Sequence, residues 1–300
     1  MAQSSSLSLI MTIEEARKEI SDALKNIYEK NESDSTTEIV MEHLTRWSRS
    51  ERVINKDLEL SFAQKSTLSQ IIQRLLLHEP IQYILNEACF AGMIFYVDKN
   101  VLIPRPETEE LVDWILKEIK TQNPIAIGSA YRILDIGTGS GCIAISIKNK
   151  LPGVEMWACD VSDEALNIAR MNADALNATI DFVALDFLDK KQRRQLPNVD
   201  LIVSNPPYVP EKDKNEMKKN VIDYEPSTAL FVPDDDPLIF YKAIADFGKE
   251  KLNTHGRIYV EIHENLGGQV IDLFQSKGYH SAEIKKDLQG KNRMIKVSLG

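Results

Sequence analysis

The chain has 300 residues, of which 43% are hydrophobic and 27% are charged, and its formal net charge is -9. This composition is ordinary for a folded globular protein, and the length favours one catalytic domain of about 200 residues with a smaller companion. The acidic balance disfavours a dedicated DNA-binding protein, because such a protein needs a Lys/Arg surface to displace phosphate counterions. Direct binding of nucleic acid is therefore not expected.

The first residues, MAQSSSLSLIMT, lack the basic region of a secretory signal peptide, and no run of about 18 apolar residues occurs in the chain. The cysteines Cys89, Cys142 and Cys159 are far apart and have neither disulfide nor metal-ligand spacing. These observations predict a cytoplasmic protein with free thiols, no bound metal and no membrane association.

From Thr12 onward, apolar residues recur at three- and four-residue steps, which predicts a bundle of helices. The polar stretch NESDSTT at 31–37 is expected to separate the first helix from the next. Short β-like runs around Gly92 then indicate a β-hairpin that leads into a second domain. We therefore expect a helical domain at 1–85 and a larger domain at 86–300.

The larger domain alternates between strand-like and helical patterns. This alternation predicts an α/β fold with a doubly wound, mostly parallel sheet of seven strands and with helices on both faces. Such sheets bind ligands beyond the carboxyl ends of their strands. The expected strands are Arg132 to Ile136, Glu155 to Cys159, Ile180 to Ala184, Val199 to Ser204, Arg257 to Ile262, His280 to Ile284 and Met294 to Ser298. The expected helices are Thr108 to Lys120, Cys142 to Lys150, Asp163 to Leu176, Pro237 to Leu252 and Gly267 to Lys277.

A glycine-rich loop follows the first expected strand and opens a helix. After Asp135 and Ile136, it consists of Gly137, Thr138, Gly139, Ser140 and Gly141. Glycine lets the backbone approach a ligand closely, and a helix N-terminus offers unpaired N–H groups to a carboxylate. Taken alone, such a loop could equally be a plain tight turn.

Acidic residues end the next two expected strands. Asp160 is in position to accept both hydroxyls of an adenosine ribose, as the acid after the second strand does in dinucleotide folds. Asp186 can meet the edge of an adenine, and Phe187 can stack on its face. Each acid alone could be a helix cap or a solvated strand end, but their joint spacing favours S-adenosyl-L-methionine (AdoMet) over NAD.

The tetrapeptide Asn205-Pro206-Pro207-Tyr208 ends the fourth expected strand. The prolines fix φ and bias Asn205 toward an extended backbone, so its carboxamide and the neighbouring carbonyl groups form a stiff set of acceptors. A planar NH2 group could donate both hydrogens to these acceptors while Tyr208 flanks its plane. We expect all four residues to bind substrate, and Asn205, Pro206 and Tyr208 to be catalytic. Asn205 is also expected to contact the cofactor.

Several long segments resemble the HemK/PrmC family, the release-factor glutamine N5-methyltransferases. The resemblance implies AdoMet as the cofactor and, as substrate, the glutamine of the Gly-Gly-Gln loop of class 1 peptide chain release factors. It implies that the glycine loop, Asp160 and Phe187 hold AdoMet, that Asn205 to Tyr208 hold the glutamine, and that Arg105 and Thr108 are candidates to line the cleft. Arg105 could equally be a surface brace. The matching segments are EPIQYIL at 79–85, VLIPRPETEELV at 101–112, ILDIGTGSGCIAISI at 133–147, DLIVSNPPYVP at 200–210, DYEPSTALF at 223–231 and KDLQGKNRM at 286–294.

The helical domain at 1–85 is expected to dock the release factor, and the enzyme is expected to be a monomer. Three alternatives remain open. One is a glutamine methyltransferase that acts on a ribosomal protein, although the IPRPETE wording favours release factors. Another is an adenine-N6 DNA methyltransferase, because a flipped adenine presents the same two N–H donors to this type of motif. The last is a non-catalytic AdoMet-dependent binding module, against which the intact Asn205 argues.

Overall fold

The computed structural model describes residues 10–122 and 131–299. They form two compact units, and the boundary in the chain lies between Asn86 and Glu87. Within the described residues, no helix has the length and apolar character needed to cross a membrane. The same residues contain no group of three or more His, Cys, Asp or Glu side chains placed to hold a metal ion.

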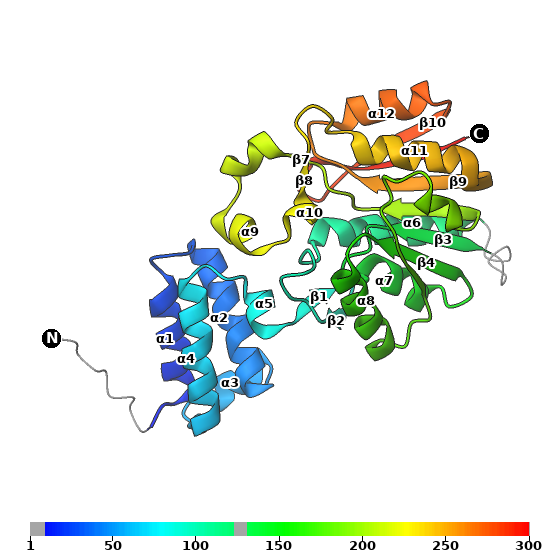
Figure 1. Ribbon diagram of the computed structural model, residues 1–300. Coiled ribbons are helices and arrows are strands. Elements are labelled where there is room, and N and C mark those ends of the chain that lie inside the picture. Colours follow the sequence, from blue (N-terminus) through cyan, green and yellow to red (C-terminus); the bar gives the residue numbers. More distant parts are fainter. Residues whose placement is uncertain (1–9, 123–130, 300) are drawn as a thin grey trace. The chain divides into compact units, whose positions relative to one another are not determined.

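The first unit is a bundle of helices with three capping boxes (Figure 1). The hydroxyls of Thr12, Ser48 and Ser61 each accept a hydrogen bond from the backbone N–H three residues on, and a Glu or Gln there reciprocates. Each box satisfies two donors that a helix start leaves unpaired. The helices are α1 (Ile13–Leu24), α2 (Lys30–Thr45), α3 (Arg49–Ile54), α4 (Phe62–Leu76) and α5 (Ile81–Leu85).

The expected break at 31–37 is wrong, because α2 runs through this polar stretch. Ser33, Thr36 and Thr37 are buried against the rest of the bundle. The Thr37 hydroxyl donates to the Ser33 carbonyl at 2.8 Å, so it stays within the helix instead of competing with it. The first two helices are separated at 25–29 instead.

The second unit begins with the predicted hairpin, in which β1 (Ala88–Phe90) pairs antiparallel with β2 (Met93–Phe95). Gly92 adopts a φ of 76°, which the turn requires and glycine tolerates. Phe90 and Phe95 are fully buried and contact each other edge to face, with ring centroids 6.0 Å apart. This hairpin therefore packs into the core of the larger unit.

A seven-stranded sheet forms the centre of the second unit, in the order β10-β11-β9-β6-β3-β4-β5. The strands from β9 to β5 are parallel to their neighbours, and β11 is antiparallel to both β9 and β10. The predicted α/β fold is thus confirmed, although β9 starts at Leu252 rather than at Arg257. The strands are β3 (Arg132–Ile136), β4 (Glu155–Asp160), β5 (Asp181–Ala184), β6 (Val199–Ser204), β9 (Leu252–Glu261), β10 (Ser281–Lys286) and β11 (Asn292–Ser298).

Helices cover both faces of this sheet (Figure 1). On one face lie α6 (Pro106–Gln122), α7 (Cys142–Lys150) and α8 (Asp163–Ala175), and on the other lie α11 (Ile239–Lys251) and α12 (Gly267–Ser276). Strand residues alternate between the two cores, as expected for a sheet buried on both sides.

The segment between β6 and α11 holds short elements that periodicity did not predict. These elements are β7 (Val209–Pro210), the 3-10 helix η2 (Glu211–Glu216), α9 (Lys219–Tyr224), α10 (Ser227–Leu230) and β8 (Phe231–Val232). Strand β7 pairs in parallel with β8. A further 3-10 helix, η1 (Gln192–Gln195), precedes β6.

The strand order reverses between β3 and β6. From β3 the chain moves outward through β4 and β5 and then returns to the other side of β3 at β6. The two strands end side by side at Ile136 and Ser204, and the Ser204 hydroxyl donates to the Ile136 carbonyl at 2.7 Å. Ligands of doubly wound sheets bind at such a switch point, so the site is to be sought here.

Candidate active site

A cavity of about 370 Å³ lies beyond the carboxyl ends of β3, β4, β5 and β6. This volume falls in the range of roughly 300 to 1,000 Å³ that small-molecule sites occupy. Four segments that are separated in the sequence meet there, namely the glycine loop, the two acidic strand ends and the tetrapeptide after β6. The expected residues that line the cavity are Gly137, Gly139, Asp160, Asp186, Phe187, Asn205, Pro206 and Pro207.

Two glycines of the loop face this cavity. Gly137 and Gly139 have φ values of 72° and 54°, and a Cβ on either would meet nothing within 4 Å. The backbone N–H of Gly139 donates to the carboxylate of Asp160 at 2.9 Å, which ties the loop to the end of β4. The loop thus exposes backbone rather than side chains to a ligand.

The other residues of the glycine loop do not line the cavity. The Thr138 hydroxyl donates to the buried Asp135 at 2.7 Å, and the Ser140 carbonyl accepts from Asn172 of α8 at 2.9 Å. A Cβ on Gly141 would lie 2.9 Å from the side chain of Ile145. These three residues therefore hold the loop against β3, α7 and α8.

Asp160 occupies the predicted place at the end of β4. One of its oxygens accepts from Gly139, and the other accepts from the backbone N–H of Ser162 at 3.0 Å. Burial raises the pKa of this carboxyl above its ordinary value, although these backbone hydrogen bonds oppose the shift. Each oxygen keeps a lone pair, so the carboxylate can still accept from a ligand in the cavity.

Asp186 and Phe187 lie along the cavity wall that follows β5. An oxygen of Asp186 accepts from the backbone N–H of Leu188 at 2.9 Å. The ring of Phe187 is buried and contacts Phe247 edge to face, with centroids 5.4 Å apart. This part of the wall combines a fixed carboxylate with an apolar surface.

A smaller cavity of about 200 Å³ shares Asn205 and Pro206 with the first. Tyr208 and Arg105 line it, together with Met217 and with residues of α9 and α10. The guanidinium of Arg105 also pairs with the buried carboxylate of Glu225 at 2.6 Å. Arg105 is therefore both a lining residue and a brace, where the sequence left a choice between the two.

A chain of hydrogen bonds runs behind the tetrapeptide. Asn205 Nδ2 donates to Thr108 Oγ1 at 3.0 Å, and Thr108 Oγ1 donates to Glu261 Oε2 at 2.7 Å. The Tyr208 hydroxyl donates to the other oxygen, Glu261 Oε1, at 3.1 Å. One carboxylate at the end of β9 thus connects both ends of the tetrapeptide to α6.

Glu261 is almost fully buried, with an exposed fraction of 1%. Burial raises its pKa to about 7, while the hydrogen bonds from Thr108 and Tyr208 and the charge of Arg293 oppose this shift. Glu261 is not among the residues that the sequence predicts for the site. An acidic residue that ends an apolar strand, in the segment RIYVEI, was the available signal.

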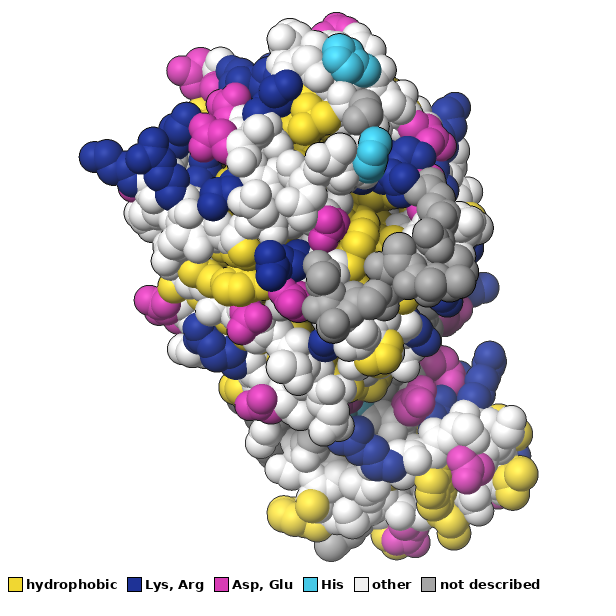
Figure 2. Space-filling model, turned by 90° about the vertical axis from the view of Figure 1, so that its right-hand side faces the viewer, with side chains coloured by type: hydrophobic (Ala, Val, Ile, Leu, Met, Phe, Trp, Pro, Cys, Tyr) yellow, Lys and Arg dark blue, Asp and Glu magenta, His cyan; other side chains and the backbone are white. Residues whose placement is uncertain are grey.

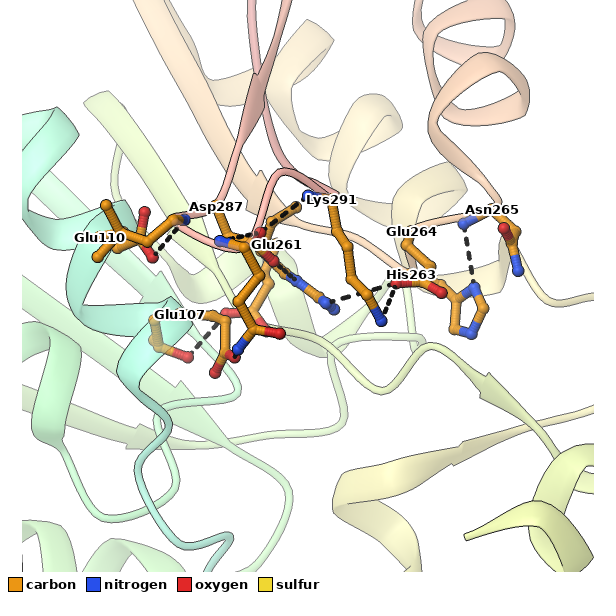
Figure 3. A network of polar contacts seen from close by, with 12 residues as sticks. Glu107, Glu110, Glu261, His263, Glu264, Asn265, Asp287 and Lys291 are labelled. Atoms are coloured by element: carbon orange, nitrogen blue, oxygen red, sulfur yellow. Dashed lines mark hydrogen bonds and ion pairs between the residues drawn. The ribbon is translucent and has the colours of Figure 1, made fainter. Parts of the chain in front are cut away.

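The loop from β10 to β11 lies beside the first turns of α6 and the segment after β9 (Figure 3). The Leu288 N–H donates to Glu110 of α6 at 3.1 Å, and Lys291 pairs with Glu264 at 2.8 Å. Arg293 pairs with Asp287 at 3.2 Å. These contacts hold Arg293 where its charge acts on Glu261 and Tyr208.

Two protein families match the chain. The PrmC N-terminal domain family matches residues 15–85, and the Methyltransferase small domain family matches residues 114–226. A solved methyltransferase from Pyrococcus furiosus resembles the fold, with a TM-score of 0.51 and 19% identity over 77% of this chain and 99% of that chain. The hMettl16 catalytic domain resembles it with a TM-score of 0.55 and 16% identity over 80% of this chain and 83% of that chain.

Two relatives are similar over nearly their whole length. The release factor glutamine methyltransferase of Flavobacterium psychrophilum is 42% identical over 96% of this chain and 99% of its own length. The enzyme of the same name from Bacteroides thetaiotaomicron is 44% identical over 92% of this chain and 96% of its own length. The chain therefore belongs to the HemK/PrmC family of release factor glutamine methyltransferases.

Proposed function

We propose that this chain transfers a methyl group from AdoMet to the side-chain amide nitrogen (N5) of the glutamine in the Gly-Gly-Gln motif of class 1 peptide chain release factors. The observation that carries this proposal is the position of Asn205, which lines both cavities. A methyl donor in the larger cavity and an acceptor amide in the smaller one would meet at this residue. The names of the two relatives support a release factor as the substrate.

The larger cavity fits AdoMet by the chemistry of its lining. Asp160 can accept the ribose hydroxyls, Asp186 can meet the adenine edge, and Phe187 offers an apolar surface to the base. Gly137 and Gly139 leave room for close approach of the ligand to the backbone. When bound, AdoMet supplies a methyl group on a sulfonium centre, which a nucleophile can attack.

The acceptor side must help a weak nucleophile. The lone pair of an amide nitrogen is delocalised, and attack on the methyl group places positive charge on that nitrogen until it releases one proton to water. The carboxamide oxygen of Asn205 and the carbonyl of Pro206 can accept its two hydrogens, and these bonds strengthen as the charge develops. Fixed acceptors also align the nitrogen with the methyl group. Tyr208 can flank the plane of the bound amide.

A protein substrate is favoured over nucleic acid. The formal net charge of the chain is -9, and basic and acidic side chains are interspersed on the face drawn in Figure 2. DNA binding draws on a Lys/Arg surface that neutralises phosphates. Adenine-containing DNA is therefore the comparison substrate in the test below.

The N-terminal unit is the proposed docking domain for the release factor. None of the residues that line the two cavities belongs to it. A cleft that holds one glutamine needs a second contact surface to select one protein among many. A fragment that starts at Glu87 should therefore show a raised KM for full-length release factor and an unchanged KM for a short Gly-Gly-Gln peptide. Equal KM values of the full chain and the folded fragment on the full-length protein would exclude docking.

The direct test is incubation of the full chain with isotopically labelled AdoMet and either release factor or DNA, followed by peptide mass mapping. We expect label on one peptide, with the added methyl group on the glutamine of the Gly-Gly-Gln motif. Label in DNA and none in release factor would overturn the proposed substrate. Binding of AdoMet without transfer to either would leave a non-catalytic binding module.

A further inference from the structure

The nitrogen and the oxygen of the Asn205 carboxamide differ in their hydrogen bonding within the protein. Its Nδ2 donates to Thr108 Oγ1, whereas no described residue donates a hydrogen bond to its Oδ1. Thr108 is 2% exposed and Glu261 is 1% exposed, so both partners in this chain of hydrogen bonds are screened from water. The arrangement thus separates an occupied donor from a carboxamide oxygen that remains available.

The order of donors along this chain follows from Glu261. An ionised carboxylate has lone pairs and no hydrogen, so the single hydroxyl hydrogen of Thr108 must point to Glu261. The oxygen of Thr108 is then left as an acceptor toward Asn205. An acceptor there requires the NH2 group of Asn205, which turns the carboxamide oxygen the other way.

We propose that Thr108 and Glu261 are positioning residues that set the orientation of the Asn205 carboxamide, so that its oxygen rather than its NH2 group meets the acceptor amide. This proposal rests on the proposed function, because an entering amide NH2 group offers two donors. The reversed carboxamide would present its own NH2 group to those donors, and the two groups would repel each other. The orientation of the Asn205 carboxamide therefore decides whether this side chain can accept a hydrogen bond from the substrate nitrogen that is methylated.

Glu261 couples this orientation to the opposite end of the tetrapeptide. Its second oxygen accepts from Tyr208, and its main-chain carbonyl accepts from the Tyr241 hydroxyl of α11 at 2.9 Å. The carboxylate is thus fixed by its own strand end and holds the ring of Tyr208 by its hydroxyl. One buried group sets both the acceptor oxygen and the aromatic wall of the smaller cavity.

A matched pair of variants tests the proposal. Thr108→Val keeps the shape of the side chain but removes the hydroxyl, whereas Thr108→Ser keeps the hydroxyl and removes a methyl group. Single-turnover transfer at saturating release factor should fall roughly 10- to 100-fold in Thr108→Val, because a buried polar group loses its partner. Thr108→Ser should stay close to the wild-type rate, and both variants should bind AdoMet as the wild type does.

Side-chain amide NMR of ¹⁵N-asparagine-labelled full-length enzyme gives a readout without activity. The Nδ2 signal of Asn205, identified from its absence in Asn205→Ala, should be protected from exchange in the wild type and in Thr108→Ser. It should lose that protection in Thr108→Val and in Glu261→Gln.

The results distinguish a positioning role of Thr108 from a packing role and from no role. Wild-type transfer rates and wild-type protection in both Thr108 variants would overturn the proposal, because the hydroxyl would then be irrelevant. An equal loss in both would assign Thr108 to packing and would also overturn it. A wild-type enzyme that fails to methylate release factor refutes the proposed function, whereas the NMR comparison still tests the orientation.

Discussion

Thr108 and Glu261 stand 153 residues apart in the sequence, and their side chains share a hydrogen bond of 2.7 Å. The bond joins the first turn of α6 to the end of β9, two elements that pack on each other through the buried pair Trp114 and Tyr259. The surroundings of the tetrapeptide therefore depend on contacts between α6 and β9, which lie far apart in the sequence.

Methyl transfer is expected to depend on the ionisation of Glu261. Its pKa is raised to about 7, and below that pH the protonated carboxyl can no longer accept from both Thr108 and Tyr208. The single-turnover rate at saturating release factor should therefore rise as pH increases through this value. Glu261→Gln should be slower and should lack this rise.

Other titratable groups lie near Glu261, so the comparison with Glu261→Gln is needed to assign the profile. Those with an electrostatic effect on it, or affected by it, are Arg293 from β11, Glu107 from α6, Tyr208 after β6, Tyr241 from α11 and Cys142 from α7. Burial raises the pKa of the Cys142 thiol to about 12 and raises the pKa of both tyrosine hydroxyls well above the ordinary value, so these groups stay neutral at neutral pH. An unchanged pH profile in Glu261→Gln would contradict the assignment.

Removing the carboxamide of Asn205 should slow the chemistry. Asn205→Ala loses an acceptor that the transition state needs more than the ground state does, so single-turnover transfer should fall roughly 10² to 10³-fold. Calorimetry should show a smaller effect on AdoMet affinity, and thermal unfolding should show a folded protein. Near-normal transfer by the folded variant would remove Asn205 from the catalytic residues.

Asp160 should matter for AdoMet affinity rather than for the rate of transfer at saturation. Asp160→Ala removes a charged acceptor, and each such hydrogen bond contributes about 1.5 to 3 kcal/mol. It also frees the N–H groups of Gly139 and Ser162, so the glycine loop should loosen. Asp160→Asn keeps one acceptor and should bind more tightly than the alanine variant. Calorimetric affinities equal to that of the wild type would place Asp160 outside the cofactor site.

Two glycines of the loop should respond differently to alanine. Gly139→Ala strains a φ of 54° at a cost of about 1 to 2 kcal/mol and puts a methyl group into the cavity, so AdoMet affinity should suffer most. Gly141→Ala adds a contact 2.9 Å from Ile145 and 3.2 Å from Ala169 to a similar strain at 81°. Overpacking of this kind costs about 1 to 3 kcal/mol more. Urea unfolding should therefore rank Gly141→Ala as the less stable variant, and the reverse order would show that α7 and α8 separate easily.

The parts of the fold that sequence could predict are those with strong local patterns. Long apolar strands, the glycine loop and the prolines after Ser204 can each be recognised from a few neighbouring residues. The continuation of α2 through 31–37 could not be read, because burial of small polar side chains inside a bundle overrides their low helix propensity.

Two parts of the site depend on contacts that local sequence does not encode. The elements α9 and α10 have six and four residues, too few to display helical periodicity, yet they form a wall of the smaller cavity. Glu261 resembles any acid at a strand end until α6 and the tetrapeptide are placed around it.

Because β3 and β6 are neighbouring strands, their pairing fixes the distance between the residues that follow them. The glycine loop follows the end of one strand and Asn205 follows the end of the next, and paired strands lie about 4.8 Å apart. Neither side can move toward the other without breaking the ladder. An asparagine held by its backbone in the same place would leave its nitrogen about 1.5 Å short, one carbon–carbon bond. On the proposed function, misplacement by about 1 Å can cost 10²-fold in rate, so the fixed spacing of β3 and β6 is expected to favour glutamine over asparagine.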